Sequence, residues 1–219
     1  MAGPPCETWS RARENSINAD HATGPRVLRD ATHLWGYDAL RIKELNQIIL
    51  GNELLLFAFE AVLELVPTQG IAMIEHPAEP ERAESASIWR TPFAKKLLDI
   101  EGIELCNFAQ GLLGAPTPKP TCILTLNSPG LISVLHRWRV RRELPQSFAL
   151  GLNEKGEWRT SVLKEYPPAM CGALAEALLT SLCAIPILDV SDPSPAELQL
   201  WQRLNASHYG QHIGPDFAG

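Results

Sequence analysis

Three short apolar runs constrain the fold of this chain more than any other feature of its sequence. They read GIAMIEHP at residues 70–77, GIELCNFAQG at residues 102–111 and PTCILTLN at residues 120–127. Apolar runs of this length, bounded by Gly, Pro or Asn, are typical of buried strands. The stretch GLLGAPTPKP separates the second run from the third and predicts a loop. We expect three strands, with the first as a buried strand of a parallel sheet.

Helical patterns surround these runs. Apolar residues recur at spacings of three and four between Ala39 and Leu65, and Gly51-Asn52 predicts a kink or break within that helix. Shorter helices are expected at residues 87–98, 131–139 and 168–182. Helices that alternate with strands indicate an α/β fold class.

The length and composition suit one large domain. The chain has 219 residues, of which 45% are hydrophobic, and this is enough to bury a sizeable core. We expect a domain at residues 1–185 and a partly disordered C-terminal extension at residues 186–219, where Asp, Pro and Ser dominate. The formal net charge of -6 excludes a broadly basic nucleic-acid-binding surface but leaves room for a local basic patch.

The five cysteines predict reduced thiols and no metal site. Their number is odd, and no two have the spacing of a zinc ribbon or of a redox Cys-x-x-Cys pair. We therefore expect an intracellular protein, in the nucleus or the cytoplasm. No membrane association is expected, because the most apolar run, LLLFAFEAVLEL, carries Glu60 and Glu64.

The N-terminal stretch GPPCETWSRAR, residues 3–13, places a cysteine directly after two prolines. It resembles the catalytic loop of cytosine-5 DNA methyltransferases, which reads Gly-Gly-Pro-Pro-Cys-Gln, any residue, Phe-Ser, any residue, Ala-Gly. The matching residues are Gly3, Pro4, Pro5, Cys6, Ser10 and Ala12. Trp9 stands for the family's aromatic residue, whereas Glu7 and Arg13 depart from the pattern.

Three further landmarks follow in the family's order. The family's Glu-Asn-Val strand end corresponds to Glu75-His76-Pro77, which keeps only the Glu. Its Gly-Val-Pro-Gln, any residue, Arg segment corresponds to GAPTPKPT, with Lys119 at the Arg position. The stretch EYPPAMCGALAEALL takes the place of a Gly-Asn segment that it lacks. The resemblance thus covers residues 1 to about 183.

The resemblance implies a fold and a chemistry. The fold is the second half of a Rossmann-like methyltransferase sheet. Residues 70–77 would be its central, parallel strand, and residues 103–109 and 122–126 an antiparallel strand pair at its edge. Cys6 would be the nucleophile that attacks carbon 6 of cytosine, which makes carbon 5 reactive. Glu75 would hold the base and protonate it. The other substrate contacts would be Pro5, Ser10, His76 and Lys119.

The implied cofactor is S-adenosylmethionine, with Pro4, Pro167 and Pro168 beside it. The family's Asp-Leu-Phe-any-Gly-any-Gly turn, which cradles this cofactor, is absent from the sequence. We therefore expect this chain to bind the cofactor weakly and not to methylate DNA alone. It looks like a fragment or an inactive remnant, whose partner would be a missing N-terminal half or a complementary chain.

One basic cluster, HRWRVRR at residues 136–142, is the expected DNA contact. Arg137 and Arg139 flank Trp138, and this combination suits phosphates with a stacked base. The same residues are also typical of an exposed helix C-terminus, where arginines interact favourably with the helix dipole. The alternative function is accordingly a non-catalytic nucleic-acid- or protein-binding α/β module. An amino-group methyltransferase fits less well, because Gly3 and Cys6 stand where that class has an Asp or Asn and an aromatic residue.

Overall fold

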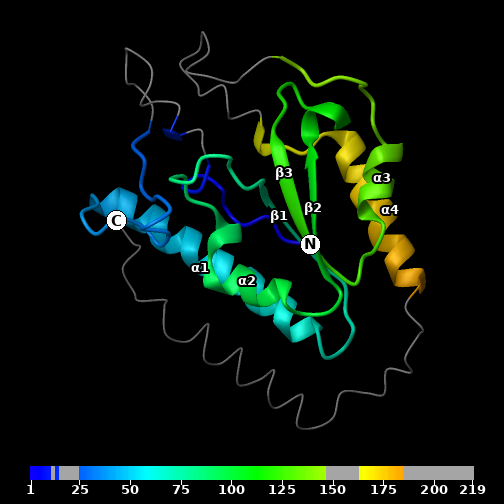
Figure 1. Ribbon diagram of the computed structural model, residues 1–219, viewed down its shortest axis with the longest axis horizontal. Coiled ribbons are helices and arrows are strands. Elements are labelled where there is room, and N and C mark those ends of the chain that lie inside the picture. Colours follow the sequence, from blue (N-terminus) through cyan, green and yellow to red (C-terminus); the bar gives the residue numbers. More distant parts are fainter. Residues whose placement is uncertain (11–12, 15–24, 147–162, 185–219) are drawn as a thin grey trace, which may run out of the picture. The chain divides into compact units, whose positions relative to one another are not determined.

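The computed structural model describes residues 1–10, 13–14, 25–146 and 163–184, and the statements below concern these residues (Figure 1). They form a mixed α/β structure with a small antiparallel sheet and four α-helices. The strands are β1 (Ala72–Pro77), β2 (Ile103–Ala109) and β3 (Pro120–Leu126). The helices are α1 (Ile42–Leu65), α2 (Pro92–Leu98), α3 (Leu131–Arg137) and α4 (Pro168–Ala184). The predicted extension at residues 186–219 lies outside the described residues.

The three predicted strands are confirmed, but their order differs from the prediction. The order is β1-β3-β2, and β3 pairs antiparallel with both neighbours, so β3 and not β1 is the middle strand. The predicted antiparallel pair of β2 and β3 is present. Residues 121–126 of β3 are all buried, as expected for a strand covered on both faces and paired on both edges. Three apolar runs predict three buried strands, and nothing local in them specifies which one lies between the others.

The outer edge of β1 carries one parallel contact. The amide of Ala2 donates to the carbonyl of Met73 at 2.8 Å, and the amide of Glu75 donates to the carbonyl of Ala2 at 2.9 Å. These two bonds form a parallel bridge between Ala2 and Ile74. The predicted parallel pairing of β1 is thus limited to this bridge, which brings the N-terminal loop to the end of the sheet.

An apolar core lies between each face of the sheet and the helices that cover that face. Side chains of a strand alternate between its two faces, so neighbouring residues of β1 and β3 belong to different cores. Ile74 and Leu124 pack in one core with helix α1, whereas Met73 and Ile123 pack in the other with α4. In Figure 1, α1 and α2 lie on one side of the sheet and α3 and α4 on the other.

Helix α1 runs through the Gly51-Asn52 pair, so the predicted break there is wrong. Gly51 is buried, and a Cβ atom on it would lie 3.4 Å from Thr8 Oγ1 and 3.8 Å from an Arg29 nitrogen. Gly51 therefore lies where the N-terminal loop packs against the helix, at ordinary van der Waals distance. The helix predicted at residues 87–98 is divided at Thr91. A 3-10 turn at Ile88–Arg90 ends there, and α2 begins there because the Thr91 hydroxyl accepts a hydrogen bond from the Ala94 amide.

Candidate active site

The N-terminal loop forms a tight turn around Cys6. The Cys6 carbonyl accepts hydrogen bonds from the amides of Trp9 at 3.0 Å and Ser10 at 2.8 Å. Pro4 is buried, and Pro5 and Cys6 are half-buried. Ser10 thus closes the turn through its backbone, while the two prolines restrict the backbone that leads into the cysteine.

A buried arginine connects this loop to helix α1. Arg29 is only 2% exposed, and its guanidinium lies 3.7 Å from the centroid of the Trp9 ring. It donates to the Thr8 hydroxyl at 2.7 Å, to the Leu34 carbonyl at 2.7 Å and to Asn52 Oδ1 at 3.0 Å. Burial lowers the pKa of Arg29 to about 9. The cation stays charged at neutral pH, and its contacts join the loop to α1 through hydrogen bonds and a cation–π contact.

Glu75 lies at the end of β1 with both carboxylate oxygens bonded. It is 8% exposed. The Tyr166 hydroxyl donates to Oε2 at 2.9 Å, and Gln110 Nε2 donates to Oε1 at 3.2 Å. Gln110 is held in turn by the Thr121 hydroxyl, which accepts from the same nitrogen at 3.0 Å. Each carboxylate oxygen has a second lone pair, so Glu75 can still bind a ligand.

Lys119 reaches the same place from the loop before β3. Its backbone has a φ of 40°, in the left-handed region that is unusual for a lysine. The ammonium donates to the Leu163 carbonyl and lies 5.6 Å from the centroid of the Tyr166 ring. Nearby, Lys164 pairs with Glu7 at 2.8 Å. A strained backbone of this kind persists only where surrounding contacts hold it.

Cys6, Glu75 and Lys119 interact electrostatically, so the structure brings these three predicted residues together. Burial raises the pKa of the Cys6 thiol, the Glu75 charge raises it further, and the Lys119 ammonium lowers it. Burial also raises the pKa of Glu75, against the hydrogen bond from Tyr166 and the charge of Lys119. Burial lowers the pKa of Lys119, which both acidic groups raise. The raised pKa means that the thiol keeps its proton at neutral pH.

This arrangement can redistribute one proton. If the proton moves from the thiol to the carboxyl group, a thiolate beside Lys119 and a neutral Glu75 result, with no change in total charge. The Glu75 charge disfavours the thiolate, and the Lys119 ammonium lowers the pKa of both acidic groups. A half-buried thiolate next to a proton donor can carry out nucleophilic addition with general acid assistance.

The structure does not bring His76 into this cluster. His76 is 2% exposed, and its ring contacts Trp9 and Trp89 in T-shaped arrangements, with centroids 6.3 Å apart in both pairs. Burial lowers its pKa to about 3. Because side chains alternate along a strand, His76 points into the core on the side opposite Glu75. The predicted substrate contact therefore has no support in the position of this ring.

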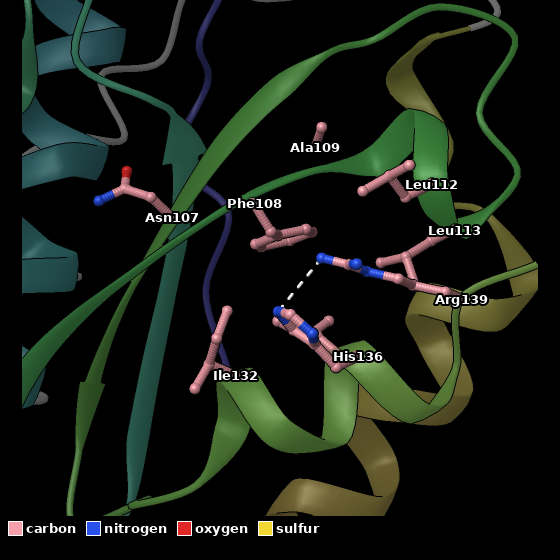
Figure 2. A pocket seen from close by; sticks show the side chains of 9 residues that line it. Asn107, Phe108, Ala109, Leu112, Leu113, Ile132, His136 and Arg139 are labelled. Atoms are coloured by element: carbon pink, nitrogen blue, oxygen red, sulfur yellow. Dashed lines mark hydrogen bonds between the residues drawn. The ribbon is translucent and has the colours of Figure 1, made fainter. Parts of the chain in front are cut away.

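The basic segment, residues 136–142, is largely occupied by local partners. Arg137 forms an ion pair with Glu176 of α4, and the Trp138 indole N–H donates to the same carboxylate. Arg139 Nη2 lies 3.1 Å from His136 Nε2. Figure 2 shows this pair beside the Phe108 ring, at a hollow lined mainly by apolar side chains. Arg137 thus has a structural partner, whereas Arg139 is exposed and has no carboxylate partner among the described residues.

The residues predicted to contact a cofactor are all prolines. Pro4 and Pro167 are buried, and Pro168 is exposed at the first position of α4. A proline offers a carbonyl oxygen but no N–H donor and no polar side chain. A methyl donor of the S-adenosylmethionine type carries an ammonium, a carboxylate and ribose hydroxyls. The three prolines therefore do not fit it as its polar contacts.

Tyr166, Gln110 and Arg29 each hold part of the site, and none of them was among the residues predicted from the sequence. A signal existed for Gln110, which is a polar residue at the end of an apolar strand. Arg29 is preceded by an apolar pair in the run VLRD. Tyr166 carries no local signal, because its role depends on a partner 91 residues away.

Among the described residues, no group of three or more His, Cys, Asp or Glu side chains is placed to hold a metal ion. Within the same ranges, each helix is too short or too polar to span a membrane. No family model matches the chain, and searches of curated proteins and of solved structures found no match.

Proposed function

We propose that this chain is a DNA cytosine-5 methyltransferase-like domain that carries the base-activating part of that chemistry. The observation that carries the proposal is that three distant segments meet around Tyr166. Its hydroxyl donates to Glu75, the Lys119 ammonium lies 5.6 Å from its ring centroid, and a Cβ atom on Gly3 of the Cys6 loop would lie 3.8 Å from Glu75 Oε2. Helices on both faces of the sheet and the parallel bridge beside β1 support its interpretation as part of a Rossmann-like sheet. DNA is the proposed partner.

The proposed reaction uses only these side chains, the base and water. The Cys6 thiolate forms a bond to carbon 6 of cytosine, and the electron pair of the 5,6 double bond moves into the ring. Nitrogen 3 takes the proton of Glu75, which becomes a carboxylate held by Tyr166 and Gln110. Carbon 5 is then enamine-like and accepts a proton from water. The hydroxide left from that water removes the original carbon 5 proton, the thiolate then leaves carbon 6, and nitrogen 3 returns its proton to Glu75.

Methyl transfer lies outside the proposal. S-adenosylmethionine is the methyl donor of the proposed class, but Pro4, Pro167 and Pro168 supply no polar contact that suits it. The proposal therefore concerns activation of carbon 5, which needs no cofactor.

The alternative is a binding module that has kept the fold without the reaction. It is favoured by the raised pKa of Cys6, since a protonated thiol is a poor nucleophile. The two functions differ in one measurable quantity, the exchange of the carbon 5 hydrogen of cytosine with solvent.

The test is hydrogen exchange on a single-stranded oligonucleotide that contains one cytosine. The full chain is incubated with it in D2O without cofactor, and mass spectrometry measures deuterium at carbon 5. The proposal expects exchange by the unaltered chain and none above background by Cys6→Ser. Glu75→Gln should slow exchange by roughly 10²- to 10⁴-fold, the range for loss of a general acid.

The matched control is Cys183→Ser, which alters an exposed cysteine at the far end of α4 and should exchange normally. Absence of exchange in the unaltered chain, together with binding of the oligonucleotide, would replace the proposal by the binding module. Equal exchange by Cys6→Ser would show that another group performs the reaction.

A further inference from the structure

The segment of residues 163–166 contacts the candidate site at three points that the proposed reaction leaves unexplained. The Leu163 carbonyl accepts from Lys119, and Lys164 pairs with Glu7 in the Cys6 loop. The Tyr166 hydroxyl donates to Glu75 Oε2 at 2.9 Å. Of these three contacts, only the last touches a group that would exchange a proton with the base.

The position of the Tyr166 hydroxyl is tightly defined. A Cβ atom on Gly3 would lie 2.7 Å from this oxygen, so the backbone of the Cys6 loop passes directly against it. The Lys119 ammonium lies over the same ring. Burial and the Glu75 charge raise the pKa of Tyr166. The hydroxyl therefore keeps its proton and acts on the carboxylate as a hydrogen-bond donor.

A donor on one carboxylate oxygen makes the two oxygens unequal. Negative charge is best placed on Oε2, which receives the short bond from Tyr166. The other oxygen, Oε1, receives a longer bond from Gln110, and that amide is shared with Thr121. A proton on Glu75 is therefore favoured on Oε1, where a free lone pair remains.

We propose that Tyr166 is a positioning residue that directs the proton of Glu75 to Oε1, the oxygen from which the base would receive it. This inference rests on the proposed function and deepens it. It assigns to the segment before α4 a role in the chemistry, in addition to its contacts with the loop.

The pH dependence of exchange reports this role. Glu75 faces Cys6 from the N-terminal loop, Lys119 from the loop before β3 and Tyr166 from the segment before α4, with Gln110 and Thr121 uncharged. The reactive form holds one proton between Cys6 and Glu75, so exchange rises through a lower apparent pKa and falls through a higher one. The lower value belongs chiefly to Glu75, because the Cys6 thiol holds its proton more tightly.

The test is the pH profile of carbon 5 exchange for Tyr166→Phe. Loss of the donated bond destabilises the carboxylate, so the acid limb should move to higher pH by roughly one unit. Gly3→Ala should shift the limb in the same direction, because the added Cβ displaces the hydroxyl. The matched control is Tyr37→Phe, since Tyr37 donates to Asp30 outside the site and its loss should leave the profile unchanged.

A second measurement keeps the inference testable if no exchange occurs. NMR titration of ¹³C-labelled glutamate, with Glu75 assigned through Glu75→Gln, gives the pKa of this carboxyl group directly. Tyr166→Phe should raise it by about one unit and Tyr37→Phe should not. An unchanged pKa or an unchanged acid limb in Tyr166→Phe would overturn the inference. An inactive chain with the expected titration shift would overturn the proposed function alone.

Discussion

The charged groups at the end of the sheet and those of the basic segment differ in burial and in their spacing along the sequence. Cys6, Glu75 and Lys119 are isolated in sequence, yet they are partly or wholly buried and change one another's pKa values. Residues 136–142 hold the densest positive charge in the sequence, yet they are exposed and their contacts lie at the surface. Charges interact strongly where water is excluded and weakly where it is not. Density of charge in a sequence is therefore a poorer guide to a site than burial.

The largest expected effect tests the role of burial and is in the pH dependence of stability. His76 is buried with a folded pKa of about 3, well below the ordinary value for histidine of about 6.5. Its contribution to the free energy of unfolding is present above pH 6.5 and is lost as pH falls toward 3. In His76→Phe, the fall in the free energy of unfolding between pH 6.5 and pH 3 should be smaller by on the order of 4 kcal/mol. Urea unfolding at a series of pH values measures it.

The control for that prediction is His136→Phe in the basic segment. His136 is exposed, so its replacement should leave the pH dependence as it is. If the two variants change the slope equally, burial does not set the behaviour of His76.

A second difference concerns the reactivity of Cys6. Lys119 lowers the thiol pKa, so Lys119→Met should raise it and slow alkylation of Cys6 by iodoacetamide at pH 8 by roughly tenfold. The rate is measured by mass spectrometry in a Cys171→Ser, Cys183→Ser background, which removes the two exposed cysteines. Arg139→Met removes a charge of the same sign from the basic segment. It should have no effect, and equal slowing by both would favour long-range charge over local contact.

The smallest effect is expected for the ion pair of the basic segment. Arg137 and Glu176 join α3 to α4 on the surface, where solvent screens the interaction. Arg137→Met should lower the Tm by no more than about 2 °C, measured by circular dichroism. A much larger drop would mean that this exposed pair acts as the buried groups do.

Much of the local structure follows from the sequence. The helical spacing before residue 65 and the Ala- and Leu-rich run after Pro167 correspond to α1 and α4, and the three apolar runs correspond to β1, β2 and β3. The predicted break at Gly51 is wrong, although glycine weakens an isolated helix. Here Gly51 meets Thr8 and Arg29, and that contact depends on segments more than 20 residues away.

The candidate site was predictable only in part. The cysteine loop, Glu75 and Lys119 could be selected because their residue types match a known chemistry in a known order. Tyr166 could not, because a tyrosine before two prolines is ordinary in itself, and the position of Gln110 at a strand end does not indicate its partner. Their role lies in bonds to Glu75 across 91 and 35 residues.

Which segments become helix, strand or loop follows from the order of the residues, because periodicity and turn residues act over a few neighbours. Packing alone places β3 in the middle of the sheet, turns His76 toward the core and Glu75 toward the site, and brings Lys119 near both acidic groups. These outcomes depend on strand order, on the face of the pleat and on exclusion of water, which are properties of packed segments. The sequence determines which chemical groups a residue carries, whereas tertiary packing determines its pKa and its partners.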